Sequence, residues 1–270
     1  MKKTNTRILW QGIWTRETPF FDAVPIWQGH IELFKRIARP DTTVEMRYPK
    51  RSTYFTSHSY LELLNNAEVV KGIIEGEKEG FDVAVIGCGN DPGLHEAREA
   101  VSIPVVGITE SAMHLACLLG ARFATIGTDR KSIPLVERNI KLYGLEGRAI
   151  ARPARACEDY NTEIPRWFAS VDYTRQYVVP AFERVAKQCI DDGAEVIVTA
   201  CGAFAALTLA GYNKVTGTEV PVIENVAVGI KMAELLSDIR KTLGISTSKQ
   251  LTYQSLPPEI RDEMAKPFFG

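Results

Sequence analysis

The sequence lacks the features of membrane-spanning, secreted and nucleic-acid-binding proteins. No apolar run approaches the roughly 20 residues that a membrane span needs, and the chain opens into a short apolar strand rather than a signal-peptide core. The 32 basic and 33 acidic residues nearly cancel, so no net charge would attract nucleic acid or an anionic membrane. We therefore expect a cytoplasmic protein with neither a membrane nor a nucleic-acid partner.

Cysteine and histidine are also scarce. The five cysteines form an odd, scattered set without Cys-x-x-Cys spacing, which argues against a disulfide framework and a zinc site. Each of the four dispersed histidines is expected to be a surface or core residue rather than a metal ligand. The segment Gly87–Gly93 lacks the spacing of a dinucleotide-binding loop, and its Pro92 delays the helix that such a loop needs. We expect no metal site and no cofactor.

The chain does contain a regular alternation of apolar β-type runs and longer stretches of helical period. This alternation is typical of an α/β fold with a mostly parallel sheet. The predicted strands are Arg7–Gln11, Thr43–Arg47, Asp82–Gly87, Pro104–Ile108, Arg122–Gly127, Arg148–Arg152, Glu195–Ala200 and Val220–Ile223. The predicted helices are Ile26–Ala38, Ser59–Glu79, Leu94–Ala100, Ser111–Leu119, Ile133–Tyr143, Tyr173–Asp192, Ala203–Leu209 and Val226–Leu243. Pro180 should kink or break the helix that contains it.

An internal repeat is the most informative feature of the chain. Asp82–Gly89 and Glu195–Gly202 both read as an acidic residue, a buried strand and a final Cys-Gly pair, and a proline opens the next strand in both copies. The repeat predicts two pseudosymmetric lobes, each a mostly parallel four-stranded sheet flanked by helices. Because parallel sheets bind ligands at the carboxyl ends of their strands, we expect Cys88 and Cys201 to flank one active-site cleft between the lobes.

A facing pair of thiols can invert a carbon centre by proton transfer. One thiolate removes the proton from one face while the other thiol donates a proton to the opposite face, and neither metal nor cofactor is needed. Backbone amides of Gly89 and Gly202 could approach a developing oxyanion, and nearby dipoles are expected to lower the pKa of the thiols. The alternative for any single cysteine is a packing role, which we expect for the other three.

The residues around both cysteines resemble the aspartate/glutamate/hydantoin racemase superfamily. The resemblance rests on Cys88-Gly-Asn-Asp-Pro-Gly-Leu94 and on Gly193–Gly202, and the first of these is most similar to the hydantoin (allantoin) racemase branch. It implies a cofactor-independent enzyme of two lobes in which Cys88 and Cys201 are catalytic. It also implies that residues 1–108 with 222–270 form the first lobe and residues 109–221 the second.

The sequence departs from that family at positions that would hold the substrate. Gln11–Trp14 replaces an Asn-Pro-Asn loop, Gly202 and Ala203 follow the second cysteine, and Glu224 stands where relatives often have Asp. Glycine after each cysteine argues against free aspartate or glutamate as substrate. We therefore expect racemisation of a 5-substituted hydantoin or a similar cyclic ureide. The alternatives are a maleate-type cis–trans isomerase or amino-acid racemase of the same superfamily, and a module that binds a ligand or senses oxidants through its thiols.

Aromatic residues are concentrated near the N-terminus, where residues 1–60 hold ten of the 24. Trp14, Tyr54 and Phe55 lie in predicted loops that could cover the cleft and receive an apolar substrate side chain. An oligomer interface or a plain core is the alternative, and we expect a homo-oligomer. Asn90 and Thr128 lie near strand ends and are expected to reach oxygen atoms of a small-molecule substrate.

Overall fold

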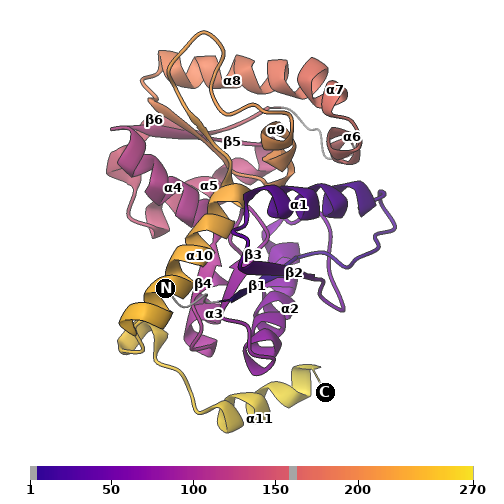
Figure 1. Ribbon diagram of the computed structural model, residues 1–270, viewed down its shortest axis with the longest axis vertical. Coiled ribbons are helices and arrows are strands. Elements are labelled where there is room, and N and C mark those ends of the chain that lie inside the picture. The colour runs from indigo at the N-terminus through magenta and orange to yellow at the C-terminus, as the bar shows by residue number, and fades with distance from the viewer. Residues whose placement is uncertain (1–4, 158–162, 270) are drawn as a thin grey trace.

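The protein is built on two parallel sheets of four strands each, as the repeat predicts. The structure is a computed structural model that describes residues 5–157 and 163–269. The first sheet has the order β2-β1-β3-β4 and the second the order β6-β5-β7-β8, one in each half of Figure 1. The strands are β1 Thr6–Gln11, β2 Thr42–Arg47, β3 Val83–Ile86, β4 Val105–Gly107, β5 Phe123–Gly127, β6 Ala149–Ala156, β7 Val196–Thr199 and β8 Val222–Ile223.

Helices cover both sheets, and the sequence predicts them less accurately than it predicts the strands. The helices are α1 Val24–Ile37, α2 Ser59–Lys78, α3 Leu94–Ala100, α4 Ile108–Leu119, α5 Ile133–Leu142, α6 Ile164–Ala169, α7 Val171–Tyr173, α8 Val179–Asp191, α9 Ala205–Leu209, α10 Asn225–Leu243 and α11 Pro258–Phe269. The single helix predicted over Tyr173–Asp192 is interrupted: Thr174–Val178 forms a π-helix, and Pro180 lies in the first turn of α8. The π-helix runs directly into α8, so the backbone changes its hydrogen-bond spacing just before this proline, which has no N–H to donate.

Two helices were not predicted, α6 and the C-terminal α11. The helix α6 has six residues, too few to display a helical period. In α11 the apolar side chains of Ile260, Met264 and Phe268 are exposed, so the helix has no buried stripe that a pattern search would find. In Figure 1, α11 lies at the edge of the molecule, below the first sheet. Among the described helices, none combines the length and the apolar character that crossing a membrane requires.

The two sheets repeat each other's hydrogen bonds as well as their strand order. Gly87 N–H donates to Gln11 O at 2.8 Å, and Ala200 N–H donates to Ile126 O at 2.9 Å. Four residues before each cysteine, an N–H donates to the proline that opens the next strand, from Ala84 to Pro104 and from Ile197 to Pro221. Cys88 and Cys201 therefore occupy equivalent positions, as the sequence repeat predicts.

The helices α4 and α10 join the two halves. The helix α4 follows β4 of the first sheet but packs Met113 and Ala116 into an apolar cluster of the second. In turn, α10 follows β8 of the second sheet and packs Val226 and Ile230 into a cluster of the first. The predicted lobe boundaries at 108/109 and 221/222 stay predictions, although β8 pairs with β7 and so lies in the second sheet.

Candidate active site

The two Cys-Gly turns touch each other at the carboxyl ends of β3 and β7. Each cysteine follows the end of its strand by two residues. A Cβ atom on Gly89 would collide with the carbonyl oxygen of Ala200 and lie 3.0 Å from the Cα of Cys201. A Cβ on Gly202 would meet nothing closer than Val226, at 3.5 Å, which is an ordinary contact. Glycine at position 89 is therefore what allows the first turn to lie against the second.

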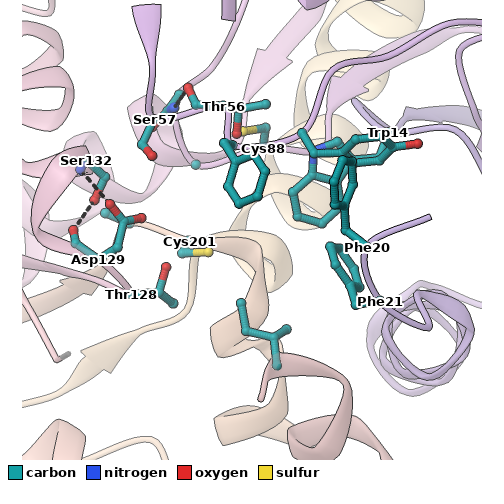
Figure 2. Close-up of a pocket in the computed structure, with 16 residues that line it drawn as sticks. Trp14, Phe20, Phe21, Thr56, Ser57, Cys88, Thr128, Asp129, Ser132 and Cys201 are labelled. Atoms are coloured by element: carbon teal, nitrogen blue, oxygen red, sulfur yellow. Dashed lines mark hydrogen bonds between the residues drawn. The ribbon is translucent and has the colours of Figure 1, made fainter. Parts of the chain in front are cut away.

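A cavity of about 300 Å³ opens beside both thiols. Figure 2 shows Cys88 and Cys201 on opposite sides of it, and both residues are half-buried. Its lining comes from both halves of the chain and consists of Trp14, Phe20, Phe21, Tyr54, Phe55, Thr56, Ser57, Cys88, Gly89, Asn90, Thr128, Asp129, Ser132, Ile164, Ala200 and Cys201. The cavity thus brings together the two cysteines that the repeat singles out.

Burial controls the acidity of the two thiols. It raises the pKa of Cys88 well above its ordinary value and raises the pKa of Cys201 as well. Hydrogen bonding acts in the opposite direction, because the N–H of Asn90 lowers the pKa of Cys88 and the N–H of Ala203 lowers that of Cys201. The hydroxyl of Thr128 also lowers the pKa of Cys201. The N–H dipoles lower the pKa of both thiols, as expected, but burial outweighs them, so the expectation of a net lowering is wrong.

Thr128, Asp129 and Ser132 form one side of the cavity (Figure 2). Asp129 begins a 3₁₀ turn over Arg130–Ser132 and accepts the N–H of Ser132 at 2.9 Å, while the Ser132 hydroxyl donates to the Asp129 carbonyl at 2.7 Å. The hydroxyl of Thr128 points toward Cys201 in Figure 2. The buried Asn90 donates its amide to the carbonyl of Thr56 at 3.3 Å. Among the described residues that line the cavity there is no lysine, arginine or histidine.

Aromatic rings form the opposite side. Phe20 packs edge-to-face on Tyr54 and on Phe55, with ring centroids 5.0 and 5.6 Å apart. Trp14 packs edge-to-face on Phe21 at 5.4 Å, and Figure 2 shows Trp14, Phe20 and Phe21 side by side across from Thr128. These rings come from the segment between β1 and α1 and from the segment between β2 and α2. The aromatic cluster therefore gives the cavity one apolar wall.

Eight of the twelve predicted site residues line this cavity. They are Trp14, Tyr54, Phe55, Cys88, Gly89, Asn90, Thr128 and Cys201. Phe20, Phe21, Thr56, Ser57, Asp129, Ser132, Ile164 and Ala200 line it without having been predicted. The concentration of aromatics before residue 60 is the signal that could have selected Phe20 and Phe21, whereas nothing in the sequence marks Ile164.

Four predicted residues lie outside the lining. Gln11 is buried, and its side chain turns toward α2, where a Cβ on Gly72 would be 2.7 Å from the Gln11 carboxamide carbon. Glu224 accepts the N–H groups of Val226 and Ala227, both at 2.8 Å, and so caps α10. Burial raises the pKa of Glu224 to about 7. Gly202 and Ala203 form the 3₁₀ turn after Cys201 and contribute backbone groups there.

His30 supports the second turn from α1. Its Nε2 lies 3.0 Å from the carbonyl oxygen of Gly202, which can only accept, so Nε2 carries the proton. Burial lowers the pKa of His30 to about 4, and the ring packs against Trp10 and Phe168. His30 is therefore a neutral core histidine, as expected. Among the described residues, no group of three or more His, Cys, Asp and Glu side chains is placed to hold a metal ion.

Comparison with known proteins assigns the chain to a family. Residues 28–233 match the family model described as Asp/Glu/Hydantoin racemase. The chain is 35% identical over 222 residues to a hydantoin racemase of Pseudomonas sp. (strain NS671), covering 82% of each chain. It is 37% identical over 186 residues to a hydantoin racemase of Rhizobium meliloti, covering 67% of this chain and 69% of that one.

A solved structure agrees with these relatives in its fold. The allantoin racemase from Klebsiella pneumoniae is 25% identical, with a TM-score of 0.76 over 93% of this chain and 94% of that one. The predicted enzyme class, an isomerase of the racemase type, is confirmed by the same comparisons. Together with the duplicated sheets, they show that the chain belongs to the Asp/Glu/hydantoin racemase family.

Proposed function

We propose that this protein racemises 5-substituted hydantoins by exchanging the proton on ring carbon C5 between Cys88 and Cys201. The observation that carries the proposal is the position of the two half-buried thiols, one from each repeat, on opposite sides of one cavity (Figure 2). A proton removed and returned by one group would reach the same face of the carbon. Two groups on opposite faces of the carbon invert its configuration, because one removes the proton and the other supplies a proton from the other side.

The reaction needs one thiolate and one thiol at the start of each turnover. The thiolate takes the C5 proton, the electron pair delocalises onto the neighbouring carbonyl oxygen, and the other thiol donates its proton to the opposite face of C5. The first cysteine ends as the thiol and the second as the thiolate, so the enzyme is then ready for the other enantiomer. No proton or electron is gained or lost overall.

The polar side of the cavity supports a neutral ring as the substrate. A hydantoin presents carbonyl oxygens and N–H groups, which pair with hydroxyl, amide and carboxylate groups such as those of Asn90, Thr128 and Asp129. An amino acid or maleate would bring a carboxylate into a lining whose described residues include no basic side chain. Burying an unpaired charge is costly, so the cavity favours the uncharged ureide.

The aromatic side of the cavity supports an apolar substituent at C5. Phe20, Phe21 and Trp14 offer ring faces and edges to a benzyl or alkyl group. A ureido substituent, which allantoin carries, would lose hydrogen bonds to water against the same rings. We therefore place the preferred substrates among hydantoins with aromatic or aliphatic 5-substituents.

A substrate comparison tests this assignment. We expect enantiomerically pure 5-benzylhydantoin to be racemised with a kcat/KM at least about tenfold above that for allantoin, a factor of the size that one apolar contact supplies. Phenylalanine and maleate should be unchanged. Chiral chromatography of each substrate, with a no-enzyme sample to subtract spontaneous racemisation, gives the rates.

The variant Phe20→Ala links the preference to the aromatic wall. It should lower kcat/KM for 5-benzylhydantoin but leave that for 5-methylhydantoin nearly unchanged, because a methyl group does not reach the wall. Phe268→Ala, which removes an exposed ring on α11, is the matched control. Racemisation of phenylalanine, or isomerisation of maleate, at a rate exceeding that of the hydantoins would refute the proposal.

A further inference from the structure

The backbone around the two thiols is the same in both halves of the molecule. Each cysteine follows the end of a central strand by two residues, and the N–H of the residue two positions further along, Asn90 or Ala203, lowers the pKa of each thiol. A symmetric backbone by itself would make the two thiols chemically equivalent. Any difference between them must come from side chains.

One side-chain position next to the thiols breaks the symmetry. The hydrogen bonds from Gly87 to Gln11 and from Ala200 to Ile126 align Gln11 with Ile126, because both donors directly precede a cysteine. Two residues further along, Thr128 is therefore the counterpart of Ile13. Ile13 is buried in the apolar cluster against which Cys88 packs. Thr128 directs its hydroxyl at Cys201 instead (Figure 2).

The charged groups around the two thiols are similar, so they do not distinguish Cys88 from Cys201 as Thr128 does. Cys88 is affected by Glu62 of α2 and by Asp91 of its own turn, and Cys201 by Asp129 after β5 and Glu224 before α10. All four are carboxyl groups and raise the pKa of the thiol they face. Glu62 is partly balanced by Arg138, 3.6 Å away, which lowers the pKa of Glu62 and not directly that of Cys88.

A further group, His30, lies behind the second turn. It contacts the carbonyl of Gly202 and is neutral, so it contributes no charge to Cys201. The hydroxyl of Thr128 lowers the pKa of Cys201, whereas the equivalent position on the first side, Ile13, offers only apolar atoms. The negative charge of Cys201 also raises the pKa of Cys88, so that ionisation of the second thiol disfavours ionisation of the first.

We propose that Thr128 is a positioning residue whose hydroxyl donates to the sulfur of Cys201, so that Cys201 is the first of the two thiols to ionise and Cys88 is the one that stays protonated. A hydroxyl that donates a hydrogen bond to a sulfur stabilises the thiolate more than the thiol, because the charged sulfur is the stronger acceptor. The hydrogen bond therefore lowers the pKa of the cysteine. The catalytic consequence rests on the proposed function: the enzyme that has lost one thiol proton accepts the enantiomer whose C5 proton faces Cys201. Since the enantiomers have equal free energies in water, kcat/KM must be equal in both directions, and the asymmetry appears in kcat and KM separately.

Alkylation of the substrate-free enzyme tests the assignment. The protein is treated with iodoacetamide over a series of pH values, and the modified cysteines are quantified by mass spectrometry of the peptides, with the half-buried Cys117 as an internal reference. In the wild type, the pH midpoint for alkylation of Cys201 should lie below that of Cys88. Thr128→Val, which keeps the shape and removes the hydroxyl, should raise the Cys201 midpoint by about one pH unit and slow its alkylation about tenfold below the midpoint.

Two further variants separate ionisation from altered packing. Thr128→Ser keeps the hydroxyl and should restore the wild-type midpoint, and the plateau rate at high pH should be the same in all three proteins. Ile13→Thr installs the missing hydroxyl on the first side and should lower the Cys88 midpoint. A Cys201 midpoint that equals or exceeds that of Cys88 in the wild type, or that Thr128→Val leaves unchanged, would overturn the inference.

The alkylation experiment and the hydantoin assay can fail separately. If the hydantoins are not racemised but the alkylation midpoints follow the predicted order, the assignment of the thiolate survives and the substrate assignment does not. If the hydantoins are racemised and the midpoints coincide, the two-thiol reaction survives and the role of Thr128 is wrong.

Discussion

Replacing Cys88 or Cys201 by serine is expected to lower the rate of hydantoin racemisation by about 10³-fold, within the range that a positioned general acid or base supplies. Serine fits the space of either thiol, but its hydroxyl holds a negative charge far less readily than sulfur does. Each variant therefore lacks one of the two groups that the reaction needs, either the base that removes the C5 proton or the acid that returns one to the opposite face. Chiral chromatography of 5-benzylhydantoin, started from each enantiomer in turn, measures the rates.

Cys117→Ser is the matched control for this prediction. Cys117 is half-buried on α4 and does not line the cavity, so its replacement should leave the rate unchanged. Circular dichroism melting curves should show that all three variants fold. If either Cys88→Ser or Cys201→Ser racemises at the wild-type rate, the exchange between two thiols is excluded.

The second large effect is expected for Gly89→Ala. Its Cβ would collide with the carbonyl oxygen of Ala200 and lie 2.6 Å from the carbonyl carbon, and both atoms belong to the backbone of the other turn. The turns must move apart, which should lower kcat about 10²-fold through misplacement of the thiols. The strain should also cost about 1–3 kcal/mol of the free energy of unfolding.

Gly202→Ala at the equivalent position is the comparison that isolates the steric cause. Its Cβ would meet only ordinary contacts, so kcat should fall less than about tenfold and the melting temperature should stay close to the wild type. Equal losses for Gly89→Ala and Gly202→Ala would mean that the close approach of the two turns is not what positions the thiols.

The architecture was predictable because its pattern occurs twice. A run of buried residues that ends in Cys-Gly is ambiguous when seen once, since a buried cysteine is commonly a packing residue. Two such runs, each followed by a strand that a proline opens, predict equivalent strands, and Asp82–Gly89 and Glu195–Gly202 prove to be the central strands of two sheets with the same order. The pairing of Cys88 and Cys201 at one cavity follows from that symmetry.

Side-chain direction was less predictable than strand position. Gln11 and Glu224 both lie at strand ends, where ligands bind, yet one turns into space left by Gly72 and the other caps a helix. The pKa of the thiols was predicted in the wrong direction, because dipoles can be inferred from a strand end but burial cannot. The contact of His30 with Gly202 joins residues 172 positions apart, which no local pattern reveals.

Besides the lobe boundaries and the roles of the site residues, three expectations from the sequence stay predictions. They are the homo-oligomeric state, the cytoplasmic location and independence from metals and cofactors. The aromatic residues bear on the first of these, because Trp14, Tyr54 and Phe55 line the cavity and so have a use other than an interface.

Solvent isotope incorporation tests the exchange of a proton between two thiols most directly. Each enantiomer of 5-benzylhydantoin is incubated with the enzyme in heavy water. At low conversion the two enantiomers are separated, and the deuterium content of each is measured by mass spectrometry. The account predicts that the inverted product carries deuterium at C5 while the remaining substrate carries none, because the acid that protonates one face is not the base that acted on the other. Deuterium in recovered substrate and product alike, or a product that retains the original proton, would contradict it.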